Sequence, residues 1–207
     1  MRKLSVNTFV SLDGVMQAPG GPEEDPSGGF AHGGWSVNYW DQTMMDSMDG
    51  YMGKPFDLLL GRRTYEIFAA HWPNVTDDPA ADALNGAAKH VASRTLDKVE
   101  WRNSTLIDGD VVEYVRRLKE REGPEIQVHG SGDLIQTLLR HELIDELRVW
   151  IFPVLLGEGK RLFAAGTVPG SLKLASSQVS KTGVVLTTYE PAGDIDYGSF
   201  ALQDTGS

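Results

Sequence analysis

Apolar residues along the chain fall into short runs and alternating segments, separated by glycine, proline and polar residues. Alternation or a short apolar run between turn residues predicts a strand, whereas apolar residues three and four positions apart predict a helix. These patterns predict strands over residues 3–12, 58–60, 89–92, 105–107, 125–129, 147–156, 172–179 and 184–189. They predict helices over 36–52, 64–71, 133–141, inside 74–88 and from 111 to the Gly123–Pro124 stop.

Strands that alternate with helices predict an α/β fold with a mostly parallel central sheet. The last two strands are joined through Lys181-Thr182-Gly183, which predicts a C-terminal antiparallel hairpin. We find no internal repeat and no linker, so the sequence predicts a single domain over 1–207. A long loop rich in glycine and proline is expected at 17–34, and a polar tail at 191–207.

Composition narrows the classes of function. The net charge of -10 argues against a nucleic-acid surface, which needs a basic face. The absence of cysteine excludes disulfides, thiolate metal sites and a cysteine nucleophile, and it agrees with a reducing cytoplasm. No apolar stretch approaches the roughly 20 residues of a membrane span, and the run after Met1 is too short for a signal peptide. We therefore expect a cytoplasmic protein with no membrane or nucleic-acid partner and no metal.

One stretch combines a buried strand, a glycine turn and a helix start. The apolar run 58–60 leads into Gly61, and Arg62, Arg63 and Thr64 follow where the helix opens. Unpaired N–H groups at a helix N-terminus bind anions, and a guanidinium fork fits a phosphate. The pattern therefore predicts an anion site, although an ordinary turn with solvated arginines explains this stretch equally well.

Three other strand ends carry polar groups. Ser93 and Arg94 follow the strand at 89–92, and a plain polar turn is an equally good interpretation there. Gly130-Ser131-Gly132 follows the strand at 125–129 and is neither the dinucleotide fingerprint nor a phosphate-binding P-loop. Asp13 ends the first strand, where it could reach a cleft, or simply hydrogen-bond its own turn.

Aromatic residues follow the long loop, and methionines recur at helical spacing after them. Trp35, Tyr39 and Trp40 could line a pocket, but packing in a core or interface is the favoured interpretation. The methionines at 44, 45, 48 and 52 are interpreted as packing as well.

Five segments resemble one enzyme superfamily. Gly61-Arg62-Arg63-Thr64-Tyr65-Glu66 resembles the Gly-Arg-x-Thr-(aromatic)-Glu turn of dihydrofolate reductases, and 128–132 resembles their Val-Ile-Gly-Gly-Gly turn. Ser11-Leu12-Asp13-Gly14 resembles the reductase domain of riboflavin biosynthesis, which shares that fold, and so do 143–147 and 153–157. The combination in this order is more specific than any one piece.

The resemblance spans roughly 3–190 and implies a dihydrofolate-reductase-like three-layer sandwich that binds NADPH. Arg62 and Arg94 would give the preference for NADPH, because an extra phosphate favours a cationic fork. The implied cofactor contacts are Thr8, Val15 and Met16 near the nicotinamide; Gly61, Arg62 and Thr64 at the adenosine-side phosphates; Ser93 and Arg94 at the 2′-phosphate and adenine; and Gly130, Ser131, Gly132, Asp133 and Leu134 around the pyrophosphate and nicotinamide.

The chain also departs from dihydrofolate reductases. Those enzymes place a carboxylate early on the helix before the Gly-Arg turn, where this chain offers only Asp41 or Asp46 and no clean match. His129 stands where they have an aliphatic residue; it could donate a proton, or be a polar residue at the mouth of a wide pocket. The expected catalytic residues are Asp13 and His129, and the expected substrate contacts are Asp13, Trp35 and Asp41.

Two functions remain open from the sequence. The first is an NADPH-dependent reductase that transfers a hydride to a pyrimidine, pterin or related small heterocycle, similar to 5-amino-6-(5-phosphoribosylamino)uracil reductase. The second is a non-catalytic nucleotide- or ligand-binding dimer that retains the fold. The apolar strand at 147–156 and the hairpin suggest a homodimer, as in the riboflavin-type reductases.

Overall fold

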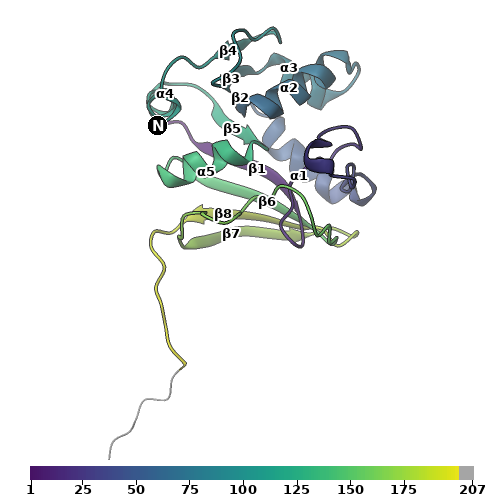
Figure 1. Cartoon of the computed structure of the whole chain (residues 1–207), viewed down its shortest axis with the longest axis vertical. Helices are drawn as coiled ribbons and strands as arrows, with labels where there is room; N and C mark the ends of the chain where they lie inside the picture. The colour runs from purple at the N-terminus through teal and green to yellow at the C-terminus, as the bar shows by residue number, and fades with distance from the viewer. Residues whose placement is uncertain (201–207) are drawn as a thin grey trace, which may run out of the picture.

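The computed structural model describes residues 1–200, which contribute one eight-stranded sheet with helices on both faces (Figure 1). The strands lie in the order β4-β3-β2-β5-β1-β6-β8-β7. The first six are parallel to one another, and β8 pairs antiparallel with both β6 and β7. Their bounds are β1 Leu4–Ser11, β2 Phe56–Gly61, β3 Ala88–Ala92, β4 Ser104–Leu106, β5 Glu125–His129, β6 Glu146–Phe152, β7 Leu172–Val179 and β8 Val185–Pro191. The predicted α/β sheet with its antiparallel hairpin is therefore confirmed.

Two apolar cores separate the sheet from its helices. Because side chains alternate between the faces of a strand, Leu59 enters one core while Leu58 and Leu60 enter the other. The first core lies under α4 Val111–Glu120 and α5 Gly132–Arg140. The second lies under α1 Gln42–Met52, α2 Arg62–His71 and α3 Pro79–Gly86. Single 3₁₀ turns occur at Ser27–Gly29, Val37–Tyr39 and Trp72–Asn74.

Two predicted elements differ from the structure by more than two residues at one end. The helix expected from residue 36 begins at Gln42, because Asp41 is extended and its side chain caps the N–H of Met44. The strand expected at 147–156 ends at Phe152, because the proline that follows has no N–H to donate.

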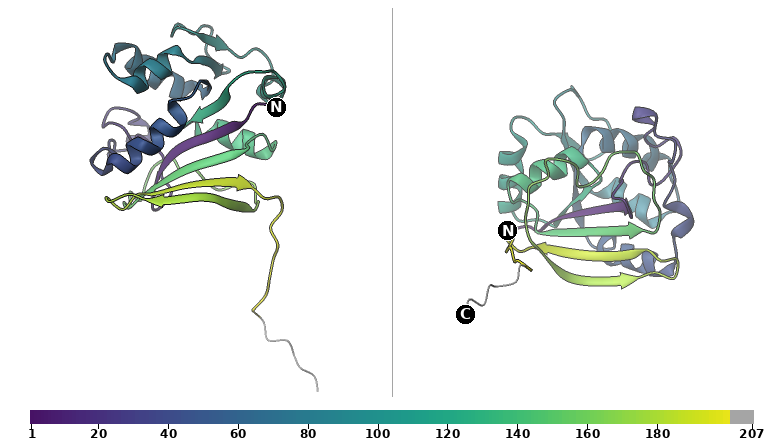
Figure 2. Two further views of the ribbon diagram at one scale, coloured as in Figure 1. Left: turned by 180° about the vertical axis from the view of Figure 1, so that it is seen from behind. Right: turned by 60° about the horizontal axis from the view of Figure 1, so that its bottom comes forward.

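The tail is drawn as an extended segment that leaves the body of the protein after β8 (Figure 2). Part of the predicted tail, 201–207, lies outside the described residues. Between residues 1 and 200, no helix is long and apolar enough to cross a membrane.

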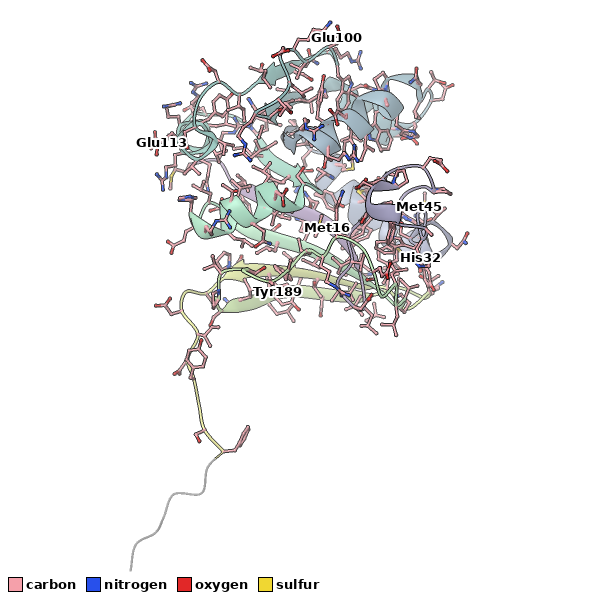
Figure 3. The ribbon with its side chains drawn as sticks, viewed as in Figure 1. Met16, His32, Met45, Glu100, Glu113 and Tyr189 are labelled. Atoms are coloured by element: carbon pink, nitrogen blue, oxygen red, sulfur yellow. The ribbon has the colours of Figure 1, made fainter. Side chains whose placement is uncertain are left out.

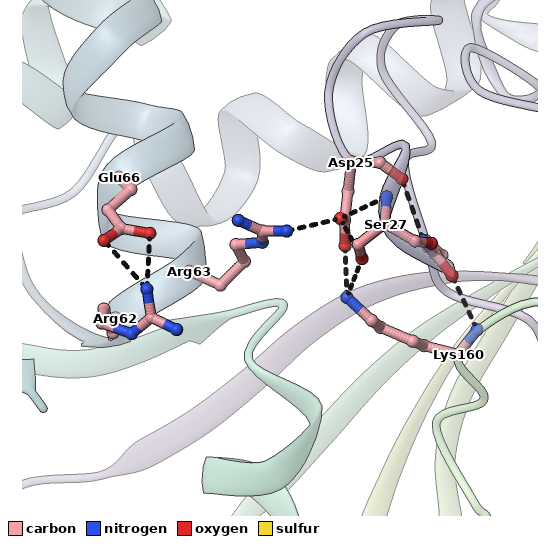
Figure 4. Close-up of polar contacts among 7 residues, drawn as sticks. Asp25, Ser27, Arg62, Arg63, Glu66 and Lys160 are labelled. Carbon is pink, nitrogen blue, oxygen red and sulfur yellow. Dashed lines mark hydrogen bonds and ion pairs between the residues drawn. The ribbon is translucent and has the colours of Figure 1, made fainter. Parts of the chain in front are cut away.

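A buried carboxylate, that of Asp25, ties the loop at 17–34 to the rest of the protein (Figure 4). Asp25 accepts a hydrogen bond from Lys160 Nζ at 2.6 Å, and Arg63 lies 3.3 Å from its other oxygen. Burial opposes the charge on Asp25, but the hydrogen bonds from Lys160 and Ser27 outweigh it and lower its pKa below 3.8. The carboxylate is therefore ionised at neutral pH and bridges the loop to α2 and to the 157–163 segment.

A buried amide holds the same loop from inside. Gln17 donates from Nε2 to the carbonyl oxygens of Asp25 and Ser27, both at 2.9 Å. Its Oε1 accepts from the backbone N–H of Lys160 at 3.0 Å. The loop is therefore fastened by side chains that all meet near Lys160.

Replacing Asp25 by asparagine should loosen this loop. The Asp25→Asn variant loses the charge that holds Arg63 and Lys160, so amide hydrogen exchange should accelerate about tenfold across 17–34. Because the pKa of Asp25 is depressed, the wild-type loop should keep its protection at neutral pH and lose it as the pH falls through that lowered pKa.

The exposed Glu23→Gln change removes the same charge from the same loop and serves as the control. Equal exchange rates in both variants would contradict a role for Asp25 in holding the loop.

Candidate functional site

The polar groups predicted at strand ends meet at one edge of the sheet. β3, β2, β5 and β1 are neighbouring parallel strands, so their carboxyl ends lie along the same edge. Ser93, Gly61, Gly130 and Leu12 directly follow or end these four strands. Ligands of open α/β sheets bind at this edge, and the sequence had no means of showing that these four ends are adjacent.

The two glycine turns are joined by the hydroxyl of Ser131. Ser131 Oγ accepts the backbone N–H of Gly61 at 2.9 Å and donates to Thr64 Oγ1, also at 2.9 Å. A Cβ on Gly61 would lie 3.3 Å from the Ser131 side chain, and one on Gly130 would lie 3.3 Å from Thr64 Oγ1. The absence of side chains at both glycines therefore lets the turns pack against each other.

Each turn leads directly into a helix, α2 after Gly61 and α5 after Ser131. Gly130 and Ser131 have φ of 55° and 66°, the left-handed region that glycine adopts at little cost and serine rarely adopts. The first N–H groups of a helix have no partner inside it, so those of Gly132, Asp133 and Leu134 at α5 are available to an anion. The N-terminus of α2 beside them adds a second positive dipole end.

The arginines at this edge differ in their partners. Arg62 Nη1 lies 3.1 Å from both oxygens of Glu66, one turn along α2, and the pair is well exposed. Exposed pairs of this kind contribute only about 0.3–0.5 kcal/mol, so a phosphate could replace Glu66 at little cost. Arg63 contacts Asp25, as described above. Arg94 is exposed and has no ion pair within residues 1–200.

The remaining predicted cofactor contacts surround the start of α5 or the neighbouring strands. Met16 Sδ lies 3.3 Å from where a Cβ on Gly132 would be, and Figure 3 labels it near α5. Val15 is fully buried, and Thr8 is buried in β1. Ser93 Oγ accepts the N–H groups of Thr95 and Leu96, so it stabilises its own turn.

Asp13 holds a loop in place. Its oxygens accept hydrogen bonds from Ser11 Oγ at 2.6 Å and from the N–H groups of Leu156 and Gly157 at 3.2 and 2.8 Å. These bonds, with that of Ser11 the strongest, lower the pKa of Asp13 to about 2. The carboxylate is therefore ionised and occupied by the N–H groups of Leu156 and Gly157, and its predicted catalytic and substrate contacts remain predictions.

His129 is neutral at physiological pH. Burial, with the nearby positive charge of Arg148, lowers its pKa to about 4. Its Nε2 lies 3.0 Å from Gln127 Oε1 and its ring is 6.3 Å from that of Phe68. A ring with this pKa holds no imidazolium proton at pH 7, so the electrostatics favour a hydrogen-bonding role over the predicted proton donation.

Trp35 and Asp41 are both engaged in packing and capping. Trp35 donates from Nε1 to the carbonyl of Gln17 and packs edge-on against Phe152, with ring centroids 5.2 Å apart. Asp41 caps α1 through Oδ1 and accepts the backbone N–H of Lys181 through Oδ2 at 2.8 Å. The packing interpretation of Trp35 is confirmed, and the substrate contacts predicted for both residues stay predictions.

The sequence did not predict two groups of residues around the site. One group fastens the loop at 17–34, and the other lies in the middle of strands. Asp25, Gln17 and Lys160 fasten the loop, while Asn7 and Arg148 lie on the sheet surface under α1. The available signal for Asn7 and Arg148 was a pair of polar residues two positions apart at the start of a buried strand, Ser5 with Asn7 and Glu146 with Arg148.

Comparison with known proteins agrees with this geometry. The family model of the RibD C-terminal domain matches residues 2–186. The chain is 26% identical to the uncharacterized protein YyaP of Bacillus subtilis (strain 168) over 193 residues, covering 91% of this chain and 94% of that one.

Solved structures share the fold. A putative riboflavin biosynthesis protein from Shewanella sp. PV-4 superposes with a TM-score of 0.65 at 23% identity, covering 93% of this chain and 99% of that one. Dihydrofolate reductase from Enterococcus faecalis, solved with NADP(H), superposes with a TM-score of 0.55 at 16% identity, covering 91% of this chain and 96% of that one. The fold is therefore dihydrofolate-reductase-like, and the chain belongs to the RibD C-terminal domain family.

Proposed function

We propose that this chain is an NADPH-dependent reductase that transfers a hydride to a small heterocycle such as a pyrimidine or a pterin. The observation that carries the proposal is the pair of glycine turns joined by Ser131, which presents two helix N-termini at one sheet edge. Two adjacent anion sites suit the two phosphates of a dinucleotide. Membership of the family and the NADP(H) bound to the similar Enterococcus enzyme support the same coenzyme here.

The residues present fit such a coenzyme. A side chain at Gly61 or Gly130 would fill the space in which the turns approach each other, and the N–H groups of Gly132 to Leu134 offer donors without partners inside the helix. Arg62 at the start of α2, with Arg94 in the turn after β3, would supply the positive charge that a 2′-phosphate favours. NADPH would supply the hydride.

In this proposal the protein positions reactants. The N–H groups of α5 and the Gly61 turn hold the phosphates, while Met16 covers the start of α5. The loop at 17–34, fastened through Asp25, would limit the entry of water if it borders the bound substrate. Such orientation and exclusion of solvent can account for most of a hydride-transfer rate, since the coenzyme carries the chemistry.

The alternative is a non-catalytic protein that binds a nucleotide or similar ligand. It is favoured by the two predicted catalytic side chains, because Asp13 is occupied by the N–H groups of Leu156 and Gly157 and His129 carries no imidazolium proton at pH 7. Under either function we propose a cytoplasmic protein. We also propose a homodimer, since β7 is the last strand of the sheet and its Leu172 and Leu174 are half exposed.

Calorimetry and steady-state kinetics separate the two functions. NADPH should bind with a dissociation constant in the micromolar range, and its absorbance at 340 nm should fall when a panel of pterins and aminopyrimidines is added. Coenzyme binding without turnover on any compound would favour the non-catalytic alternative. No binding of either nicotinamide coenzyme would refute both the reductase and its coenzyme site.

Changing Arg62 to alanine should affect one coenzyme selectively. The Arg62→Ala variant should weaken NADPH about tenfold or more and NADH less than twofold, because only NADPH carries the phosphate that pairs with the guanidinium. Titration calorimetry with both coenzymes measures the difference. Glu66→Gln, which removes the competing carboxylate, is the control and should leave NADPH binding equal or tighter; equal losses for both coenzymes in Arg62→Ala would contradict this role.

Changing Ser131 to alanine should affect both coenzymes alike. The variant leaves the N–H of Gly61 without its partner and frees the two turns from each other. We expect a loss of about 1–3 kcal/mol in unfolding free energy and weaker binding of NADPH and NADH by the same factor. Urea unfolding and calorimetry measure the two effects, with exposed Ser176→Ala as the control. If the variant lost affinity for NADPH but kept its affinity for NADH, the role of Ser131 would not be limited to joining the two turns.

A further inference from the structure

A separate cleft lies at the antiparallel end of the sheet. A cavity of about 180 Å³ opens between the second half of α1 and the strands β6, β8 and β7. None of the residues that line it is among the predicted coenzyme, catalytic or substrate contacts. Pockets for drug-sized ligands measure about 300–1,000 Å³, so this cleft suits a smaller molecule.

Two rows of register partners across β6, β8 and β7 form the base of the cleft. They are Arg148, Thr188 and Ser176 in one row, and Trp150, Leu186 and Gln178 in the next. Side chains of register partners point to the same face of a sheet, and Trp150 and Leu186 belong to the core under α1. Both rows therefore face α1, where Ser47 and Tyr51, one helical turn apart, line the opposite wall.

An irregularity in β7 decides which of its side chains face the cleft. The pairing of β7 with β8 shifts by one residue between Leu174 and Ser176. Such a shift moves every later side chain to the other face of the strand. Ser176 and Gln178 therefore face α1, where Ser177 and Val179 would otherwise lie. The bulge places hydrogen-bonding side chains in the cleft and turns an apolar one away from it.

Four polar side chains in the cleft have unused hydrogen-bonding capacity. Those of Ser47, Ser176, Gln178 and Thr188 make no hydrogen bond with residues 1–200. Ser47 and Thr188 are half-buried, so water reaches them from the open side of the cleft only. A hydroxyl or an amide can both donate and accept. The set therefore suits a ligand with several hydroxyl groups, which also donate and accept.

The charges around the cleft are already balanced. Among the lining residues only Arg148 is charged at neutral pH, and its Nε and Nη2 lie 2.5 and 2.8 Å from Glu146 and Glu125. Lys3 pairs with Glu146 as well. Two positive and two negative charges cancel, so the cleft offers no net attraction to an anion or a cation.

An apolar strip lies beside the polar groups. Trp150 and Leu186, which are otherwise buried, both line the cavity. The C–H face of a sugar or cyclitol ring can pack on such a strip while the hydroxyls at its rim reach the polar side chains. A purely apolar ligand would leave those side chains without partners.

We propose that this cleft is a second ligand site, which binds one neutral ring carrying several hydroxyl groups, such as a monosaccharide or a cyclitol. Ser47, Thr188 and Gln178 hydrogen-bond the ring hydroxyls, and Trp150 contacts the C–H face. The site shares no residue with the glycine turns, so it stands whether or not the chain is a reductase.

Titration of the ¹⁵N-labelled full chain tests the site. We expect myo-inositol, D-glucose or D-galactose to shift the amide resonances of 47–51, 148–150, 176–178 and 186–188 together and to leave 61–64 and 130–134 unchanged. A ligand of about twelve non-hydrogen atoms should bind with a dissociation constant of about 1–5 mM. Cyclohexanol, the same six-carbon ring with one hydroxyl, should bind at least about tenfold more weakly.

Two results of this titration would overturn the proposal. One is the absence of such shifts with all three polyols at about 50 mM, ten times the weakest expected dissociation constant. The other is binding of cyclohexanol as tightly as the polyols, because the polar side chains would then have no part in recognition.

Substitutions assign the contacts. Thr188→Val removes a hydroxyl with little change of shape and should weaken the bound polyol about three- to tenfold. Gln178→Ala, on the exposed edge strand where folding is least affected, should do the same. Thr105→Val, exposed on β4 at the other end of the sheet, is the matched control and should have no effect. If both cleft variants bind the polyol as the wild type does, the assignment fails.

Discussion

The hydroxyl of Ser131 is the contact on which the candidate site depends. It lies within 2.9 Å of both the N–H of Gly61 and the hydroxyl of Thr64, and so joins the ends of two strands 70 residues apart in the chain. Serine reaches this position only because its backbone is left-handed, directly after a left-handed glycine. The helices that follow lie on opposite faces of the sheet, and this contact brings their N-termini together at the sheet edge.

The two faces of the sheet bury different kinds of side chain. Under α4 and α5, side chains such as Val6, Ile126 and Leu147 are fully buried and supply apolar stabilisation. Under α1, the first halves of the same strands bury polar residues that bond mostly to one another, such as Arg148 to Asn7 and to Glu125, before Phe9 and Trp150 enter the second apolar core. Burying polar groups costs stability unless they are paired, so the Nδ2 of Asn7, which has no partner among residues 1–200, is a cost of this polar face.

Local features of the fold could be predicted from the sequence, but contacts between residues far apart in the chain could not. The run 58–60 followed by Gly61 and Arg62 predicted the βα turn correctly, because each signal lies within a few residues. The carboxylate of Asp25 meets Lys160 from 135 positions away, and no local pattern indicates such a pairing. Asp41 had the residue type of a helix cap, but the methionines and aromatics around it extended the predicted helix too far. Asn7 was visible as a polar residue in a central strand, yet its missing partner appears only once β5 and β6 are placed beside it.

The claim that the two glycine turns hold one dinucleotide can be tested residue by residue. In a ¹⁵N-labelled sample titrated with NADPH, the amide resonances of 61–64 and 130–134 should shift together with one dissociation constant, while those of β7 stay unchanged. Shifts confined to one turn, or spread over β7 and the hairpin, would contradict the account.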